Sequence, residues 1–202
     1  MGIWAIVPVK SINKGKNPLS EILSDEERAT MNITMLGNTL SILRSLPEIE
    51  QTMVISADNA VLSMARDYGA KTLQEDGQSN IGVAMTKATM VAKMYNATGL
   101  LVLSADIPLL TKKDMQLMLT LGKNPPILVM APDLQGSGTN AICLNPTDLM
   151  KISVGKDSYK KNLEEAAKFN IRVATCQLTS LGLDLDNPDD MDLLRQTQAL
   201  QV

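Results

Sequence analysis

Three aspartates stand where carboxylates could hold a divalent cation. Asp106 follows the apolar run 100–104 almost directly, and Asp184 and Asp186 flank Leu185. Side chains two residues apart in an extended segment point to the same side, so Asp184 and Asp186 could share one cation. Carboxylate oxygens, water and phosphate oxygens are the ligands that Mg²⁺ prefers. The competing interpretation is that these aspartates only shape turns and a helix entry.

A basic loop follows the first apolar run of the chain and could face a triphosphate. Residues 10–16 include Lys10, Lys14, Gly15 and Lys16. Ammonium groups and backbone amides at the carboxyl end of a strand can both bind phosphate. The loop matches neither the G-x-G-x-x-G pattern nor the P-loop, so those motifs lend no support. A solvated basic turn is the competing interpretation.

Two glycine-containing segments could approach an anionic substrate. The first, residues 135–140, ends with Thr139 and Asn140, and the second runs from Gly155 to Ser158. Glycine lets a backbone come close to a ligand, and free amides at the start of a helix can bind phosphate. An ordinary hairpin turn and an ordinary helix cap are the competing interpretations.

The composition limits the chemistry that these groups can perform. The chain of 202 residues has no histidine, which excludes imidazole acid–base catalysis, Ser-His-Asp hydrolysis and His-ligated zinc. The formal net charge of −3 argues against a nucleic-acid partner, which needs a clustered basic face. Cys143 and Cys176 lack C-x-x-C spacing and are expected to be reduced, buried thiols. With no signal-peptide pattern and no apolar stretch of about 18 residues, the sequence predicts a cytoplasmic protein without a membrane segment.

Short apolar runs alternate with longer helical patterns along the chain, and these elements must position the polar groups. The expected strands cover residues 3–9, 53–56, 70–73, 100–104, 127–130, 139–144 and 171–178. The alternation predicts a single domain over residues 1–202, with an α/β, Rossmann-like fold and a mostly parallel sheet covered by helices on both faces. Ligands bind at the carboxyl ends of the strands in such sheets, where the candidate residues lie.

Local signals predict several helix ends. Ser24 to Glu27 forms a capping-box pattern, Gly69 suits the end of a short helix, and Asn187 with Pro188 suits the start of the last one. Further helices are expected over residues 111–121 and 158–169. The expected apolar faces are Ala29, Ile33, Leu36, Leu40 and Leu43 in the first long helix, and Ile81, Ala84, Ala88, Val91 and Tyr95 in a later one.

Five segments, taken in order, carry a resemblance to a known family. They are Val7-Pro8-Val9-Lys10 with the following Lys16 and Leu19, residues 103–110, Gly138 to Ala141, Gly155 to Ser158, and residues 183–190. In this order and spacing they resemble the CofC-type family. That family contains 2-phospho-L-lactate guanylyltransferases and bacterial relatives that use phosphoenolpyruvate.

The resemblance implies a nucleotide-diphospho-sugar transferase fold, a homodimer and a guanylyltransferase reaction. GTP and a small phosphorylated acid would give a guanosine-diphospho-linked acid and pyrophosphate, for biosynthesis of the deazaflavin coenzyme F420. The implied Mg²⁺ ligands are Asp106, Asp184 and Asp186. The implied nucleotide contacts are Pro8, Lys10, Lys16, Asn80 and Asp106, of which Lys10, Lys16 and Asp106 would be catalytic. The implied contacts to the acid are Thr139, Asn140, Gly155 and Ser158. The attacking phosphate is already an anion, so the reaction needs no histidine.

The chain departs from the family pattern in the first loop. Pro18 stands where relatives have an arginine, and a proline side chain can neither donate hydrogen bonds nor carry charge. Ser79 also stands where leucine is common, and Tyr159 is a mild change after Ser158. Two alternatives therefore stay open. One is a sugar phosphate or molybdopterin-type acceptor on the same fold, and the other is a non-catalytic nucleotide-binding paralogue.

Overall fold

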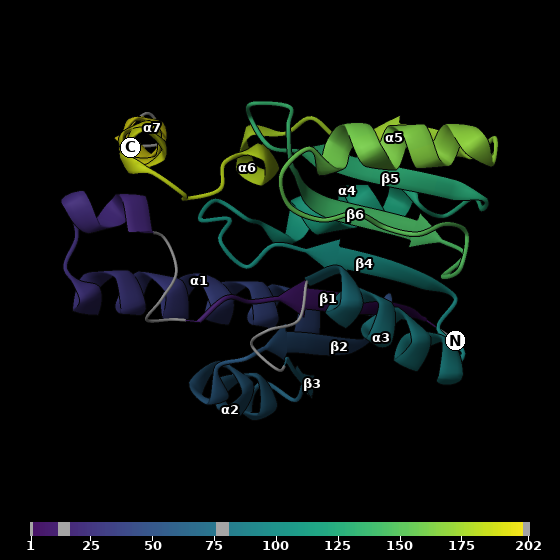
Figure 1. Ribbon diagram of the computed structural model, residues 1–202, viewed down its shortest axis with the longest axis horizontal. Helices are drawn as coiled ribbons and strands as arrows, with labels where there is room; N and C mark the ends of the chain where they lie inside the picture. Colours follow the sequence, from purple (N-terminus) through teal and green to yellow (C-terminus); the bar gives the residue numbers. More distant parts are fainter. Residues whose placement is uncertain (1, 12–16, 76–80, 200–202) are drawn as a thin grey trace.

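A seven-stranded sheet forms the centre of the protein, within residues 2–11, 17–75 and 81–199 that the computed structural model describes (Figure 1). The strands are β1 (Ile3–Pro8), β2 (Ile49–Ser56), β3 (Lys71–Gln74), β4 (Gly99–Leu103), β5 (Ile127–Pro132), β6 (Thr139–Asn145) and β7 (Arg172–Thr175). Their order in the sheet is β3-β2-β1-β4-β6-β5-β7. β6 pairs antiparallel with β4 and β5, and the remaining pairs are parallel. The predicted mostly parallel sheet is confirmed.

Helices cover both faces of this sheet because alternate residues of each buried strand point to opposite sides. The helices are α1 (Asp25–Arg44), α2 (Asn59–Asp67), α3 (Ile81–Met94), α4 (Lys112–Leu121), α5 (Ser158–Lys168), α6 (Thr179–Gly182) and α7 (Pro188–Ala199), with a short 3-10 helix η1 (Asn17–Glu21). Ala5 and Val7 of β1 pack in one core with α1, α2 and α4, and Trp4 and Ile6 pack in another with α3 and α5. The α/β architecture predicted from the sequence is confirmed.

The predicted helix caps are present. The Ser24 hydroxyl accepts a hydrogen bond from the Glu27 amide at 3.2 Å, and the Glu27 carboxylate accepts one from the Ser24 amide at 2.8 Å. Gly69 follows α2 with a φ of +80°, a left-handed conformation that glycine adopts without strain. The Asn187 side chain accepts from the Asp190 amide at 3.1 Å at the start of α7. Each cap therefore lies where its residue pattern predicted it.

Three local predictions were wrong. Ile33 is 42% exposed, because the N-terminal part of α1 extends beyond the strands (Figure 1). Tyr95 is 58% exposed, because it follows the last residue of α3. One side of its ring still contacts the buried Trp4, with a ring-centroid separation of 5.3 Å. The strand expected over 171–178 ends at Thr175, because the chain then turns into α6, whose Leu181 enters the core.

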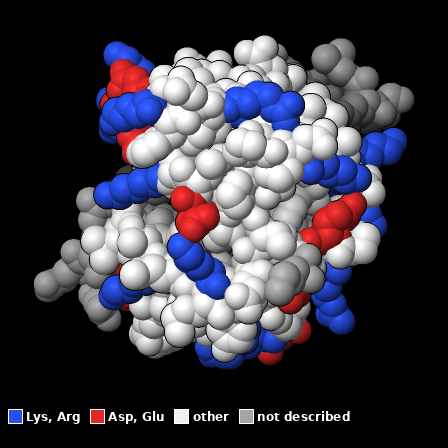
Figure 2. Space-filling view, turned by 90° about the vertical axis from the view of Figure 1, so that its right-hand side faces the viewer, with Lys and Arg blue, Asp and Glu red and all other residues white. Residues whose placement is uncertain are grey.

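Three broader expectations concern a clustered basic face, a membrane segment and the two cysteines. On the face drawn in Figure 2, lysine and arginine side chains are dispersed among acidic and uncharged ones. None of the helices in the described ranges is long and apolar enough to cross a membrane. Cys143 and Cys176 are both buried free thiols, as predicted, and burial raises the pKa of Cys143 to about 12.

The reversed direction of β6 places its first residues at the same edge of the sheet as the last residues of β1, β4 and β5. Segments from distant parts of the sequence therefore meet at one edge. This is the edge at which ligands bind in open α/β sheets.

Candidate active site

A cavity of about 790 Å³ opens at this edge of the sheet. Its walls come mainly from three regions: the residues after β1 and β4, the segment between β5 and β6, and the two loops that precede α5 and α7. Single residues are added by α1, by the chain after β3 and by α3: Asn32, Glu75 and Ile81. Val102 and Ile142 from neighbouring strands supply an apolar part of the lining. The cavity has the size and the mixture of apolar and polar groups that a small-molecule site needs.

Asp106 enters the cavity directly after β4 and is held from two sides. The Ser104 hydroxyl donates a hydrogen bond of 2.5 Å to the carboxylate of Asp106. The amide of Leu185 donates to the backbone carbonyl of Asp106 at 3.1 Å. This bond from Leu185 joins the segment that follows β4 to the segment that precedes α7. It thereby brings the carboxylates of Asp106, Asp184 and Asp186 to the same part of the cavity.

Asp184 and Asp186 line the cavity on either side of this bond. Leu183 and Leu185 are each 1% exposed, and they pack in a small apolar cluster with α1 and α7. Because side chains alternate along an extended segment, burial of the two leucines turns both aspartates towards the cavity. The predicted pairing of Asp184 with Asp186 on one side is confirmed.

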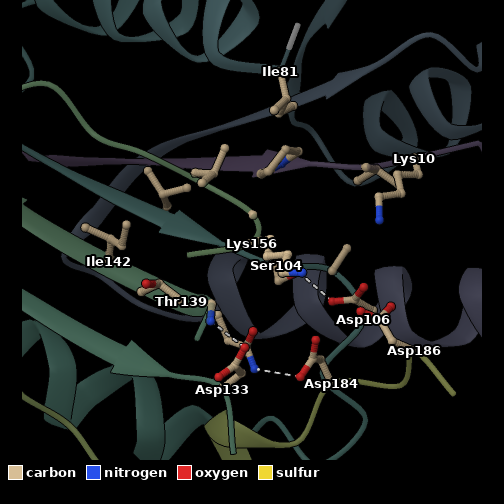
Figure 3. Close-up of a pocket in the computed structure, with 18 of the residues that line it drawn as sticks. Lys10, Ile81, Ser104, Asp106, Asp133, Thr139, Ile142, Lys156, Asp184 and Asp186 are labelled. Carbon is tan, nitrogen blue, oxygen red and sulfur yellow. Dashed lines mark hydrogen bonds between the residues drawn. The ribbon is translucent and has the colours of Figure 1, made fainter. Parts of the chain in front are cut away.

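The carboxylates of Asp106, Asp184 and Asp186 lie near one another in Figure 3, and the Lys10 ammonium group points towards them. The pKa of Asp184 is raised to about 6, chiefly by burial and in addition by the charges of Asp106 and Asp186. A hydrogen bond from Asn140 opposes this shift. A cluster in which like charges raise a carboxyl pKa gains stability from a bound cation or a lysine.

The three aspartates do not enclose an ion by themselves. Within residues 2–11, 17–75 and 81–199, no group of three or more histidine, cysteine, aspartate or glutamate side chains converges closely enough to hold a metal ion. Mg²⁺ is commonly held in such open sites by one or two carboxylates, with phosphate oxygens and water completing its shell. The donor set therefore fits Mg²⁺ bound together with a phosphate-bearing substrate.

The opposite wall is built from the loop between β5 and β6. The Asp133 carboxylate accepts hydrogen bonds from the amides of Ser137 and Gly138 at 2.8 and 2.5 Å. A Cβ atom on Gly138 would lie 2.6 Å from an Asp133 oxygen, so the loop requires glycine at this position. The Ser137 carbonyl accepts from the amide of Tyr159, which fixes the loop against the first turn of α5.

The residues predicted to bind the acid gather at this wall. Thr139, Asn140 and Gly155 line the cavity. Ser158 is fully buried behind them, where its hydroxyl donates to the Thr139 hydroxyl at 3.1 Å and its amide donates to the Gly155 carbonyl. Ser158 thus supports Thr139 in the arrangement described, and direct contact of these four residues with substrate stays a prediction.

The predicted nucleotide contacts are only partly described. Pro8 and Lys10 line the cavity after β1. Lys16 and Asn80 lie outside the described residues, as do Lys14, Gly15 and Ser79. The roles of Pro8 and Lys10 in nucleotide binding stay predictions.

Several lining residues were missed by the sequence-based reasoning, among them Asp133, Asn32 and Glu75. Asp133 stands one residue after β5, as Asp106 stands soon after β4, and a carboxylate at a strand end before a glycine-rich loop could have been read as a loop-shaping group. Asn32 lines the cavity from the middle of α1, and no local pattern marks it.

Comparisons with known proteins agree with this geometry. The profile of the family described as "Guanylyl transferase CofC like" matches residues 3–195. A protein from Rubrobacter xylanophilus named phosphoenolpyruvate guanylyltransferase is 32% identical over 201 residues, covering 100% of this chain and 97% of its own. A protein from Methanocaldococcus jannaschii named 2-phospho-L-lactate guanylyltransferase is 33% identical over 187 residues, covering 92% and 79%.

A solved structure extends the likeness to three dimensions. A Desulfovibrio desulfuricans protein described as a nucleotide-diphospho-sugar transferase superimposes with a TM-score of 0.79 at 16% identity, covering 98% of this chain and 88% of its own. At this identity the comparison concerns the fold alone. It agrees with the nucleotidyltransferase-like α/β architecture that the strand order shows.

Proposed function

Because the chain belongs to the family of CofC-like guanylyl transferases, we propose that it transfers a guanylyl group from GTP to a small phosphorylated acid. The acid is 2-phospho-L-lactate or phosphoenolpyruvate, the two substrates in the names of similar proteins. The observation that carries the proposal is the meeting of Asp106, Asp184 and Asp186 in front of Lys10, at the ligand-binding edge of the sheet.

The reaction is a substitution at the α-phosphorus of GTP. A phosphate oxygen of the acid forms a bond to this phosphorus, the bond to the bridging oxygen of the β-phosphate breaks, and pyrophosphate leaves with that electron pair. Catalysis then depends on holding the two anions in line and on stabilising the charge that develops. The chain has no histidine, and this reaction requires none because the attacking group is already ionised.

Different residues would bind the triphosphate, the Mg²⁺ ion and the acid. Lys10 would face the triphosphate, as would Lys16 outside the described residues. Asp106, Asp184 and Asp186 would hold Mg²⁺, which when bound supplies positive charge next to the phosphate oxygens. Thr139 and Gly155 would contact the acid, and Lys156 lines the cavity beside them. Lys156 thus offers an ammonium group to an acceptor that carries both a phosphate and a carboxylate.

The family resemblance supports two further parts of the proposal. The product would enter the biosynthesis of coenzyme F420, and the protein would be a homodimer. Sedimentation velocity tests the second part: a single species at twice the 21.9 kDa chain mass is expected, and a monomer at micromolar concentration contradicts it.

A substrate panel tests the reaction itself. Purified protein with Mg²⁺ is incubated with each of the four nucleoside triphosphates, and with 2-phospho-L-lactate, phosphoenolpyruvate or a sugar phosphate, and pyrophosphate is measured. We expect release with GTP and one of the two acids. Preferential release with the sugar phosphate would favour a different acceptor class, and no release with any pair would overturn the proposal.

The altered first loop motivates one competing function. Pro18 is exposed on η1 and carries no charge, at the position where the family resemblance implies an arginine. A chain that binds nucleotide without turnover would act as a regulatory or scaffolding protein. Calorimetric titration with GTP, run beside the panel, separates the two: binding without pyrophosphate release supports the non-catalytic function, and turnover excludes it.

A further inference from the structure

Asn140 is the second residue of β6, and its buried side chain contacts the carboxylate cluster. It is 6% exposed, and its amide nitrogen donates to the carbonyls of Leu181 and Gly182 at 3.0 and 3.1 Å. The same nitrogen lies 3.3 Å from a carboxylate oxygen of Asp184. One amide group therefore links β6 to the end of α6 and to the aspartate that follows it.

The backbone of Asn140 reaches the other arm of the cluster. Its carbonyl accepts a hydrogen bond from the Ser104 amide at 2.8 Å. Ser104 in turn donates its hydroxyl to the Asp106 carboxylate at 2.5 Å. Asn140 is thus connected to Asp184 through its side chain and to Asp106 through its backbone and Ser104.

From these contacts we propose that Asn140 is a positioning residue that sets the separation of Asp106 and Asp184, and with it the affinity of the cluster for a divalent cation. The proposal rests on the proposed function, because it takes these carboxylates as the Mg²⁺ ligands. Hydrogen-bond partners of metal-binding side chains orient them and tune the affinity of the site.

The geometry favours this role over direct contact with the acid, the role that the sequence resemblance implied. The two amide hydrogens of Asn140 are already distributed over three acceptors. A substrate oxygen could gain one only by leaving a buried backbone carbonyl without its partner, which is unfavourable. The other side-chain atom is an oxygen, which can only accept hydrogen bonds and would repel a phosphate or carboxylate.

The reversed direction of β6 makes this connection possible. Because β6 pairs antiparallel with β4, its first residues lie beside the last residues of β4, at the mouth of the cavity. A parallel strand in this place would put its last residues there instead. The position of Asn140 between two distant segments is therefore a property of the sheet topology.

Binding of Mn²⁺ to the full-length protein without nucleotide tests the proposal, with the ion titrated into the millimolar range because the carboxylates alone hold it weakly. Mn²⁺ serves as a paramagnetic probe, and the free ion is followed by electron paramagnetic resonance. In Asn140→Ala we expect the dissociation constant for Mn²⁺ to rise about 10- to 100-fold. Asn140→Ser keeps a shorter hydroxyl donor and should show a smaller rise, which keeps the test open if the alanine variant does not fold.

A matched control lies at the other end of the same strand. Asn145 donates its side-chain amide to the Gly122 carbonyl at 2.9 Å, so Asn145→Ala also removes a hydrogen bond from β6 to a backbone carbonyl. This variant should lose thermal stability while its Mn²⁺ affinity stays within about 2-fold of wild type. Unchanged Mn²⁺ affinity in folded Asn140→Ala or Asn140→Ser, or an equal loss in Asn145→Ala, would overturn the positioning role.

Steady-state kinetics separate this inference from the proposed function. In Asn140→Ser we expect a lower kcat at subsaturating Mg²⁺ with little change in KM for the acid, whereas a residue that contacts the acid would raise that KM. If wild-type protein releases no pyrophosphate but Asn140→Ala weakens Mn²⁺ binding, the proposed function fails and the positioning role stands. If transfer occurs and Mn²⁺ affinity does not depend on Asn140, only the positioning role fails.

Discussion

The two walls of the cavity are constructed in different ways. The wall after β1 offers Lys10 on a chain that leaves the sheet, with Ser11 bonded to the Asp58 carboxylate at 2.8 Å. The wall around β6 is a network in which Asp133, Ser137 and other polar groups bond to one another. The first wall presents charge to a ligand, and the second presents a fixed shape.

Under the proposed function, this difference would separate the recognition of the two substrates. A triphosphate carries many charges and can be held by ammonium groups and a cation with little demand on shape. A small acid has few atoms, so its recognition depends on a wall whose position is set in advance. The carboxylates of Asp106, Asp184 and Asp186 lie at the junction, where under the proposed function both reactants would depend on them.

The largest expected effect concerns this junction. Asp106→Asn keeps the size of the side chain and removes the charge that would hold Mg²⁺. We expect pyrophosphate release to fall about 10³-fold, because charge stabilisation at the phosphorus is the main contribution available to this active site. The circular dichroism spectrum should stay unchanged, and activity within 10-fold of wild type would show that Asp106 is not a metal ligand.

The next effect tests whether the second wall acts through its shape. In Gly138→Ala the new methyl group would meet Asp133 at 2.6 Å, so the loop must shift. We expect kcat/KM for the acid to fall about 100-fold with a KM for GTP close to wild type. Gly136→Ala is the matched control, because Gly136 has a φ of +71° and no atom within 4 Å, so alanine there is strained without a collision. Equal losses in the two variants would argue against a fixed wall.

The pH dependence of stability tests the electrostatics of the junction. The pKa of Asp184 is raised from 3.8 to about 6, so the unfolded chain loses this proton at a lower pH than the folded protein. The stability of metal-free protein therefore falls as pH rises through this window, and the loss is complete above about pH 6. In EDTA, Asp184→Asn should be more stable than wild type by about 1–3 kcal/mol at pH 8 and by much less at pH 4.

Thermal unfolding at both pH values, with and without Mg²⁺, measures this effect. Added Mg²⁺ at pH 8 should raise the Tm of wild type more than that of Asp184→Asn. A variant that is less stable than wild type at pH 8 in EDTA would contradict the cost of holding a charged Asp184 in its buried place beside Asp106 and Asp186.

The smallest effect concerns the charge on the second wall. Lys156→Gln removes an ammonium group that lines the cavity next to Gly155. We expect KM for the acid to rise about 5-fold while KM for GTP stays within about 2-fold, as for an exposed charge contact. Lys160→Gln is the control, since its side chain is 82% exposed and pairs with Glu164 on the outer face of α5. A rise in KM for GTP alone would place Lys156 on the nucleotide instead.

The sequence predicted those features that depend on neighbours in the chain. Asp184 and Asp186 were expected on one side because of their spacing, and burial of Leu185 between them explains the success. The Ser24 capping box was predicted because both of its partners lie within four residues. The alternation of strands and helices likewise follows from local hydrophobic periodicity.

Features that depend on distant packing could not be predicted in this way. Ile33 fits the apolar period of α1, yet its side chain is exposed because this part of the helix extends beyond the edge of the sheet. The bond from Asn140 to Asp184 joins residues 44 positions apart, and no sequence pattern marks such a pair. The antiparallel direction of β6, which creates this contact, could not be predicted either, because its apolar sequence resembles that of a parallel strand.

The bond from Leu185 to Asp106 has a consequence for how the enzyme could be divided. Every strand of the sheet precedes Leu183, so a protease cut between Thr175 and Asp184 would leave the sheet continuous and remove two of the three clustered carboxylates. The strands of the sheet and two of the three clustered carboxylates therefore lie in separate stretches of sequence. Two fragments that re-associate through Leu185 and α7 would rebuild the carboxylate cluster, which makes this junction a point at which a split-protein reporter can be tried.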